Sequence, residues 1–387
     1  MKRIALFALL ALTFGATSAQ TFTLRGTVPG LKAGSEVVLA ARHQGELARG
    51  VASDGSFTLT GSVDMPLLAE LRINDGGDEG VGHAIDLMVE NVPIEISAAH
   101  IDSIPPGFYF GGAGKLKEKN VTVKGGQAQQ EYAEYAAAMF PYQYLEKVAH
   151  QYLWGNDSRR RPKADRQAAS KAYDGAQMMT AAANDAFIKE HPLYAISSIK
   201  WLEALAQPFA FTSEELGDLS MTLGETPHPV YRQRLAEAIA KARKFTKGMH
   251  YADFEVLDVD KKPHKISSLI PEGKYAMVDF WASWCGPCRA SIPHVRELWQ
   301  KYGDRLEVFS VSVDAGEADW RKAMEQEKME WTQLWDDESR LGPLREHFGL
   351  STIPYMLLFS PDGKIVYAGH DANEVSETLA KELDSQL

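Results

Sequence analysis

Cysteine is nearly absent from this sequence. The 387 residues include only Cys285 and Cys288, which form one C-x-x-C motif. An exported protein stabilised by disulfides would carry cysteines in distant segments, and a structural zinc site would need four ligands. A purely structural disulfide in so small a loop would constrain the unfolded chain little. We therefore expect a working redox pair, with no metal and no cofactor.

Basic residues are outnumbered by acidic ones, 41 to 52, and no segment after the N-terminal run is long and apolar enough to span a membrane. The formal net charge is −11, which disfavours nucleic acid as a partner. An N-terminal apolar run from Ile4 to Phe14 follows a basic start and precedes the small residues Thr17 and Ala19, as in a secretory signal. The run is shorter than the ~20 residues of a membrane anchor. We expect residues 1–19 to be a signal peptide and the protein to reside in the periplasm or cell envelope; an uncleaved anchor or a buried first helix is the alternative.

The rest of the chain falls into three parts with different patterns. Residues 20–126 contain short, partly alternating apolar runs separated by turn formers, which predicts a β-rich module. Residues 127–247 show apolar residues at helical spacing and predict an all-helical connector, in which prolines such as Pro141 should separate the helices. Residues 248–387 alternate between strand and helix patterns and predict an α/β layer fold. The expected fold class is therefore multidomain.

The C-terminal part predicts individual elements. A dense apolar strand should run from Tyr275 to Trp281, a helix from Gly286 towards Tyr302, and a second strand from Leu306 to Val313. A second helix is expected from Glu317 to Glu327. The turn residues Ser360-Pro361-Asp362-Gly363 predict a hairpin.

The C-x-x-C motif lies between the first of these strands and the first helix. At a helix N-terminus, backbone N–H groups and the positive end of the helix dipole stabilise a thiolate, which is the form that attacks disulfides. Cys285 is therefore the expected nucleophile, and Cys288 is expected to resolve the mixed disulfide. Gly286 should permit a tight turn, and Pro287 fixes φ where a backbone N–H is dispensable.

The run Trp284-Cys285-Gly286-Pro287-Cys288 resembles the W-C-G-P-C active-site signature of the thioredoxin family. Residues 248–387 resemble the exported TlpA/ResA-like branch of the thioredoxin-like superfamily. Residues 20–247 more loosely resemble the N-terminal extension of Bacteroidetes-type members. The resemblance implies a thioredoxin-like C-terminal fold and thiol–disulfide oxidoreductase activity.

The same resemblance implies supporting roles outside the motif. Pro354 would be a cis-proline beside the redox pair, and Asp279 a buried acid that takes a proton from Cys288. Glu317 would match the acid of ResA-like members, and Trp284 would shield one side of the sulfurs. The residues leave alternatives open, because Asp279 could be an ordinary paired carboxylate, Glu317 a helix N-terminal charge partner and Pro354 a trans proline.

These observations predict an enzyme that exchanges disulfides with exported client proteins and receives electrons from a membrane electron-donor protein. The reducing direction is favoured, because thioredoxin itself is strongly reducing. A disulfide oxidase or isomerase, and a client-binding or scaffold module with a redox-tuned domain, remain alternatives. A thiol peroxidase would need Pro and Thr before its cysteine, and this sequence lacks them.

Overall fold

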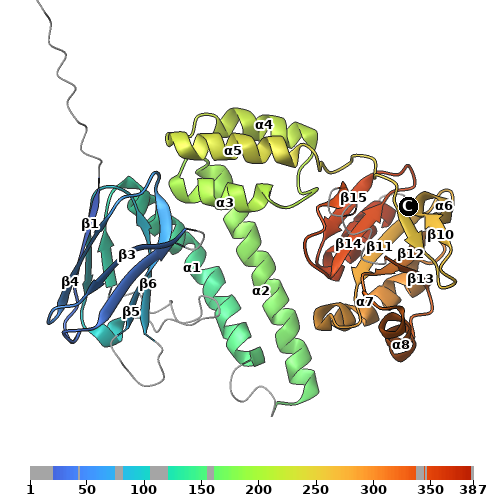
Figure 1. Ribbon diagram of the computed structural model, residues 1–387, viewed down its shortest axis with the longest axis horizontal. Coiled ribbons are helices and arrows are strands. Elements are labelled where there is room, and N and C mark those ends of the chain that lie inside the picture. Colours follow the sequence, from blue (N-terminus) through green and yellow to red (C-terminus); the bar gives the residue numbers. More distant parts are fainter. Residues whose placement is uncertain are drawn as a thin grey trace, which may run out of the picture. The chain divides into compact units, whose positions relative to one another are not determined.

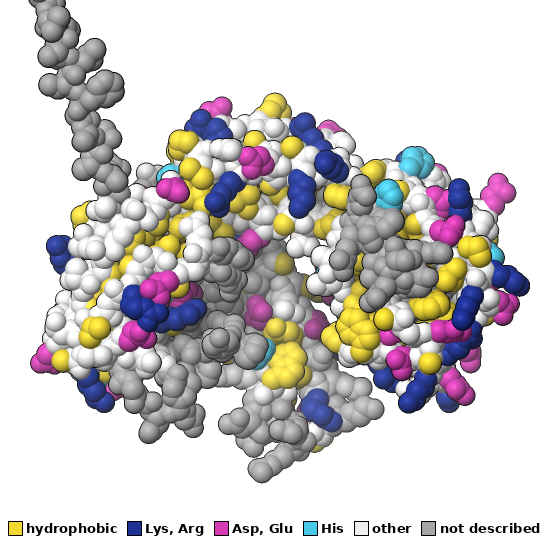
Figure 2. All heavy atoms as spheres, viewed as in Figure 1, with side chains coloured by type: hydrophobic (Ala, Val, Ile, Leu, Met, Phe, Trp, Pro, Cys, Tyr) yellow, Lys and Arg dark blue, Asp and Glu magenta, His cyan; other side chains and the backbone are white. Residues whose placement is uncertain are grey.

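The chain forms two compact units, residues 1–197 and residues 198–387 (Figure 1). The computed structural model describes residues 21–41, 44–74, 82–104, 121–154, 161–336, 344 and 347–384. The expected signal peptide, residues 1–19, lies outside the described residues. Among the helices that are described, none combines the length and apolar character of a membrane span. On the face in Figure 2, described acidic and basic side chains are interspersed.

Two four-stranded sheets form the β-rich part of the first unit. Their strand orders are β4-β1-β7-β8 and β3-β2-β5-β6. One hydrophobic cluster contains residues of both sheets, including Leu24, Leu39 and Leu71, so the sheets enclose a common core. Burial alternates along the strands, as expected where one face is solvated. The strands are β1 (Phe22–Thr27), β2 (Glu36–Ala41), β3 (Gly45–Val51), β4 (Ser56–Gly61), β5 (Leu67–Asn74), β6 (His83–Val89), β7 (Pro93–Ala98) and β8 (Val121–Lys124).

Two long helices follow the sheets and pack side by side (Figure 1). They are α1 (Gln127–Trp154) and α2 (Lys163–Glu190). The start of α1 is tied to the β part, because Met88 N–H donates to Gln129 Oε1 at 2.8 Å and Ala128 N–H donates to Glu90 Oε1 at 3.0 Å. The expectation that Pro141 separates two helices is wrong, since Pro141 lies inside α1. Packing along α2 holds the helix together despite the backbone hydrogen bond that proline removes.

Three shorter helices lead to the C-terminal sheet. They are α3 (Ala195–Leu205), α4 (Ser213–Leu223) and α5 (Pro229–Ala242). A capping box starts α4, with Thr212 Oγ1 accepting from Glu215 N–H and the Glu215 carboxylate accepting from Thr212 N–H. Helices α1 and α2 belong to the same compact unit as the β part, and α4 and α5 belong to the unit of the C-terminal sheet. The three-way division at residues 126 and 247 stays a prediction.

A seven-stranded sheet of order β10-β9-β13-β12-β11-β14-β15 forms the C-terminal core. Strand β11, an interior strand, pairs parallel with β12 and antiparallel with β14. Every residue of β11 and β14 is buried, as expected for strands covered on both faces. The strands are β9 (Glu255–Leu257), β10 (Pro263–Lys265), β11 (Tyr275–Trp281), β12 (Leu306–Ser312), β13 (Thr332–Trp335), β14 (Tyr355–Phe359) and β15 (Ile365–Gly369).

Helices accompany this sheet in alternation with its strands. They are α6 (Ile266–Leu269), α7 (Gly286–Tyr302), α8 (Glu317–Glu327) and α10 (Ala372–Asp384). The bounds expected for β11, α7 and α8 are confirmed, and the turn at residues 360–363 joins β14 to β15. The predicted fold class is also confirmed, with a β-rich N-terminal part, a helical middle and an α/β C-terminal part.

Candidate active site

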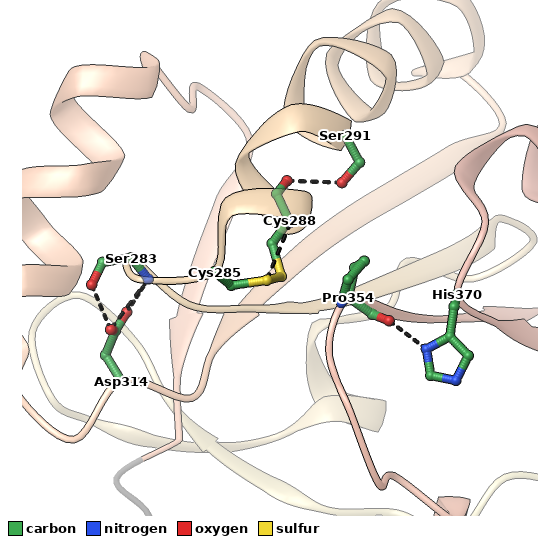
Figure 3. Close-up of a disulfide and its surroundings, with 7 residues drawn as sticks. All are labelled: Ser283, Cys285, Cys288, Ser291, Asp314, Pro354 and His370. Atoms are coloured by element: carbon green, nitrogen blue, oxygen red, sulfur yellow. Dashed lines mark hydrogen bonds between the residues drawn. A yellow bond between two sulfur atoms is a disulfide. The ribbon is translucent and has the colours of Figure 1, made fainter. Parts of the chain in front are cut away.

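The C-x-x-C motif lies where β11 ends and α7 begins. Cys285 is the N-cap residue of α7, and Cys288 N–H donates to Cys285 Sγ at 3.2 Å. The two cysteines form a disulfide, with their Cα atoms 5.3 Å apart. In the reduced state, the same N–H and the helix dipole would stabilise a negative charge on the Cys285 sulfur. The structure therefore brings together the predicted redox pair and the helix end that activates it (Figure 3).

The two residues between the cysteines form the first turn of α7. Pro287 stands where the helix needs no backbone N–H. Gly286 was expected to permit a tight turn, but its φ does not lie in the left-handed region. A Cβ added there would meet nothing within 4 Å. The backbone therefore does not require glycine at position 286.

Both cysteines are buried, whereas the neighbouring Trp284 is mostly exposed. Cys285 is 5% exposed and Cys288 is 1% exposed, whereas Trp284 is 70% exposed. Trp281 is fully buried and contributes to the core, as expected for a packing residue. Cys285 is thus the more exposed residue of the pair, and Trp284 offers a large apolar surface next to it.

Asp279 is a buried carboxyl group in the interior strand β11. Its Oδ2 accepts from Ser310 Oγ at 3.2 Å, and its Oδ1 has no hydrogen-bond partner among the described residues. Burial raises the pKa of Asp279 to about 7, and the Ser310 hydroxyl opposes that rise. Trp331 Nε1–H donates to Ser310 Oγ at 2.9 Å, so the Ser310 proton is directed to Asp279. The side chain can therefore gain or lose a proton near neutral pH.

Asp314 is a second buried acid, which sequence reasoning missed. It follows β12, and its carboxylate accepts from Ser283 N–H at 2.9 Å, from Ser283 Oγ at 2.7 Å and from Ser312 Oγ at 2.8 Å. The first two bonds hold the loop between Trp281 and Cys285 (Figure 3). The signal that could have found it is a polar residue directly after a buried parallel strand, since such strand ends meet at one sheet edge.

The loop before β14 supplies the expected cis-proline. The Ile353–Pro354 peptide bond is cis. Figure 3 shows the sulfur atoms pointing toward Pro354. The Pro354 carbonyl oxygen accepts from Nδ1 of His370 at 2.6 Å, which places the His370 proton on that nitrogen. His370 was not singled out in the sequence, and no motif marks it.

Glu317 has partners of a different kind. It begins α8, where its carboxylate accepts from Lys261 Nζ at 2.5 Å and from Arg321 Nε at 2.7 Å. The hydrogen bonds from Lys261 and then Arg321 lower the pKa of Glu317. These contacts are those of a helix N-terminal charge partner, and none of them reaches the cysteines. Within the described part of the chain, no group of three or more His, Cys, Asp or Glu side chains could hold a metal ion.

Comparisons with known proteins match the C-terminal domain. Residues 248–368 match the AhpC/TSA family. The thiol–disulfide oxidoreductase ResA of Bacillus cereus is 24% identical over 147 residues, which cover 37% of this chain and 82% of that protein. Thioredoxin 1 of Synechococcus elongatus is 44% identical over 59 residues, which cover 15% of this chain and 51% of that protein.

Solved structures resemble the same region. The thioredoxin domain of a thiol–disulfide oxidoreductase from Bacteroides vulgatus is 26% identical, and the match covers 35% of this chain and 96% of that one with a TM-score of 0.33. A putative thiol:disulfide interchange protein DsbE from Chlorobium tepidum is 28% identical, with coverage of 35% and 96% and a TM-score of 0.32.

The family match, the ResA relatives and the redox pair at the start of α7 define the class of protein. The C-terminal domain is thioredoxin-like and matches the AhpC/TSA family over residues 248–368. Over this domain the chain is similar to the thiol–disulfide oxidoreductase ResA, and the similarity supports an oxidoreductase activity. The resemblance of residues 20–247 to a Bacteroidetes-type N-terminal extension stays a prediction.

Proposed function

We propose that the chain reduces disulfides in exported client proteins through Cys285. The observation that carries this proposal is the position of Cys285 at the N-cap of α7, with its sulfur accepting the Cys288 N–H. Reduction starts when the Cys285 thiolate attacks a client disulfide. A mixed disulfide forms, and one client sulfur leaves as a thiolate that takes a proton from water.

Cys288 completes the transfer of two electrons. Its thiol loses a proton to the Asp279 carboxylate, and the resulting thiolate attacks Cys285 Sγ. The mixed disulfide breaks, the second client thiolate leaves, and the disulfide between Cys285 and Cys288 forms. A proton acceptor with a pKa of about 7 suits this step, because it is ionised at neutral pH and still basic enough to accept a proton.

The proposed setting is the periplasm or cell envelope. The signal-like residues 1–19 support export, and the ResA relatives support a role in thiol exchange. A membrane electron-donor protein with a dithiol would return the disulfide to its reduced form by the reverse sequence of exchanges. The two remaining uses of such a pair, disulfide formation and isomerisation, differ from this proposal in the reduction potential that they require.

A trapping experiment tests which sulfur attacks the client. In Cys288→Ser, the mixed disulfide on Cys285 cannot be resolved, so covalent complexes with exported proteins should accumulate in cells. Cys285→Ser is the matched control, since it keeps one cysteine of the same loop. Equal trapping by both variants, or trapping by Cys285→Ser alone, would contradict the assignment of Cys285 as the nucleophile.

A further inference from the structure

The far half of α1 exposes apolar side chains that a monomer would be expected to bury. The buried residues of α1 extend only as far as Met139. Beyond that point, five large apolar side chains on α1 are each between 40% and 50% exposed, and Met179 on α2 is exposed to a similar degree. The five are Phe140, Tyr144, Leu145, Val148 and Tyr152. Exposed apolar side chains that cluster in one patch commonly mark a site of interaction with another molecule.

A groove of about 720 Å³ runs between the two helices beside this row. Leu145, Val148 and Tyr152 line it on the α1 side. Small residues line most of the α2 side, among them Ala172 and Gly175. The large residues of α1 therefore form a ridge along the edge of a groove that the small residues of α2 keep open.

The groove suits a helix better than an extended peptide. Its one charged lining residue is Asp165, and its other lining side chains are apolar except for the Tyr152 hydroxyl. An extended peptide would lose water from its backbone N–H and C=O groups and find almost no partner in exchange. A helix satisfies its own backbone and needs only an apolar row to fill the groove.

The ridge of α1 in a second copy is such a row. Phe140, Tyr144 and Val148 recur every four residues, which places them along one strip of the helix, and Tyr152 continues the strip with the Arg161 guanidinium 3.7 Å from its ring centroid. A two-fold axis would place the ridge of each copy in the groove of the other, so that both apolar surfaces become buried at once. Because ridge and groove belong to the same helix pair, neither copy needs any other element of its partner.

The exposed side chains of the ridge supply part of the area that a dimer interface requires. An aromatic side chain contributes roughly 150–250 Å² when fully exposed. The three aromatic side chains of the ridge, which are almost half exposed, therefore contribute roughly 200–330 Å² per copy, and Leu145, Val148, Met179 and the small residues of the groove add to this area. A standard-size interface buries about 800 Å² per partner.

We propose that the chain forms a two-fold homodimer in which the α1–α2 pairs of two copies pack into a four-helix bundle. The ridge of each α1 fills the partner's groove between α1 and α2, in the manner of interdigitating helices. The dimer carries two redox pairs. This proposal does not depend on the direction in which those pairs transfer electrons.

Light scattering after size-exclusion chromatography tests the proposal on the full chain. The wild type should have the mass of a dimer at micromolar concentration. Val148→Glu should raise the dimer dissociation constant at least about a hundredfold, because the two-fold axis buries two unpaired carboxylates in each dimer. Glutamate has a higher helix propensity than valine, so α1 should still form. Far-UV circular dichroism and unchanged disulfide exchange by Cys285 check that the variant is folded.

Met221→Glu is the matched control. Met221 lies on α4, outside the groove, and is 70% exposed. This variant should remain a dimer. If Val148→Glu fails to fold, Tyr144→Glu, at a half-exposed position of the same ridge, takes its place. A monomeric wild type, or a dimer that persists in the folded ridge variant, would overturn the proposal.

Discussion

Replacement of Asp279 by asparagine should remove a pH dependence of stability that the buried carboxyl imposes. Burial raises the pKa of Asp279 from 3.8 to about 7 in the folded chain. Between these two values, the unfolded carboxyl has lost its proton while the folded carboxyl still holds it. The folded state then binds more protons than the unfolded state, so the free energy of unfolding falls as pH rises through this window. Above pH 7 both states are ionised and the loss is constant.

The size of the effect follows from the pKa difference. A change from 3.8 to about 7 corresponds to a loss of about 4 kcal/mol at pH 8 relative to pH 4. The asparagine variant cannot show this loss. Its amide also has to find partners in a site where Ser310 is the hydrogen-bonding neighbour, which costs about 1–3 kcal/mol at every pH. The free energy of unfolding of the variant, relative to that of the wild type, should therefore rise by about 4 kcal/mol from pH 4 to pH 8, so that the variant is the less stable form at pH 4 and the more stable form at pH 8.

Urea unfolding of the oxidised chain at a series of pH values measures this difference. All tryptophans except Trp154 lie in the unit of residues 198–387, so tryptophan fluorescence reports mainly on the unit that contains Asp279. Subtracting the two profiles removes the contribution of every group that the substitution leaves unchanged. Profiles that fall in parallel for Asp279→Asn and the wild type would refute a raised pKa at this site.

Three further substitutions have defined expectations. Ser310→Ala removes the hydroxyl that opposes the rise, so the pKa of Asp279, read from the midpoint of the same pH profile, should increase further. Asp314→Asn weakens the hydrogen bonds that Ser283 donates to this side chain, so urea unfolding should show a free energy of unfolding lower by about 2–3 kcal/mol. An unchanged urea midpoint would contradict the role of Asp314 in holding the loop between Trp281 and Cys285. Trp284→Ala should change stability by less than about 0.5 kcal/mol, because its side chain is mostly exposed. Trp284→Ala should lower the rate of insulin reduction more than the rate of reduction of a small disulfide. Equal effects on both rates would argue against a contact between Trp284 and the client protein.

Local patterns made much of the C-terminal domain predictable. A dense apolar run marks a strand buried on both faces, and this applies to Tyr275–Trp281. The Cys-Gly-Pro-Cys run fixes the start of α7, because the proline at the second helical position needs no N–H partner. The cis bond before Pro354 followed from resemblance to a family, since local propensity alone favours trans.

Contacts between distant residues were not predictable in the same way. Ser283 and Asp314 are 31 residues apart, and only the parallel pairing of β11 with β12 brings their strand ends together. Glu317 was ambiguous in the sequence, and its partners Lys261 and Arg321 are those of a helix N-terminal charge partner; a role for it in the redox reaction stays a prediction. Pro141 remained inside α1 because packing against α2 outweighed a local helix-breaking signal.

Equilibration of the purified chain with defined thiol buffers, followed by alkylation and mass measurement, tests the central claim most directly. If Cys285 and Cys288 are a reducing pair, the mass of the alkylated chain should shift in a single two-electron transition. The midpoint potential of this transition should be close to that of thioredoxin, about −270 mV. A midpoint near the about −120 mV of DsbA would contradict the reducing function. A disulfide that does not react with the buffers at all would contradict the redox function itself.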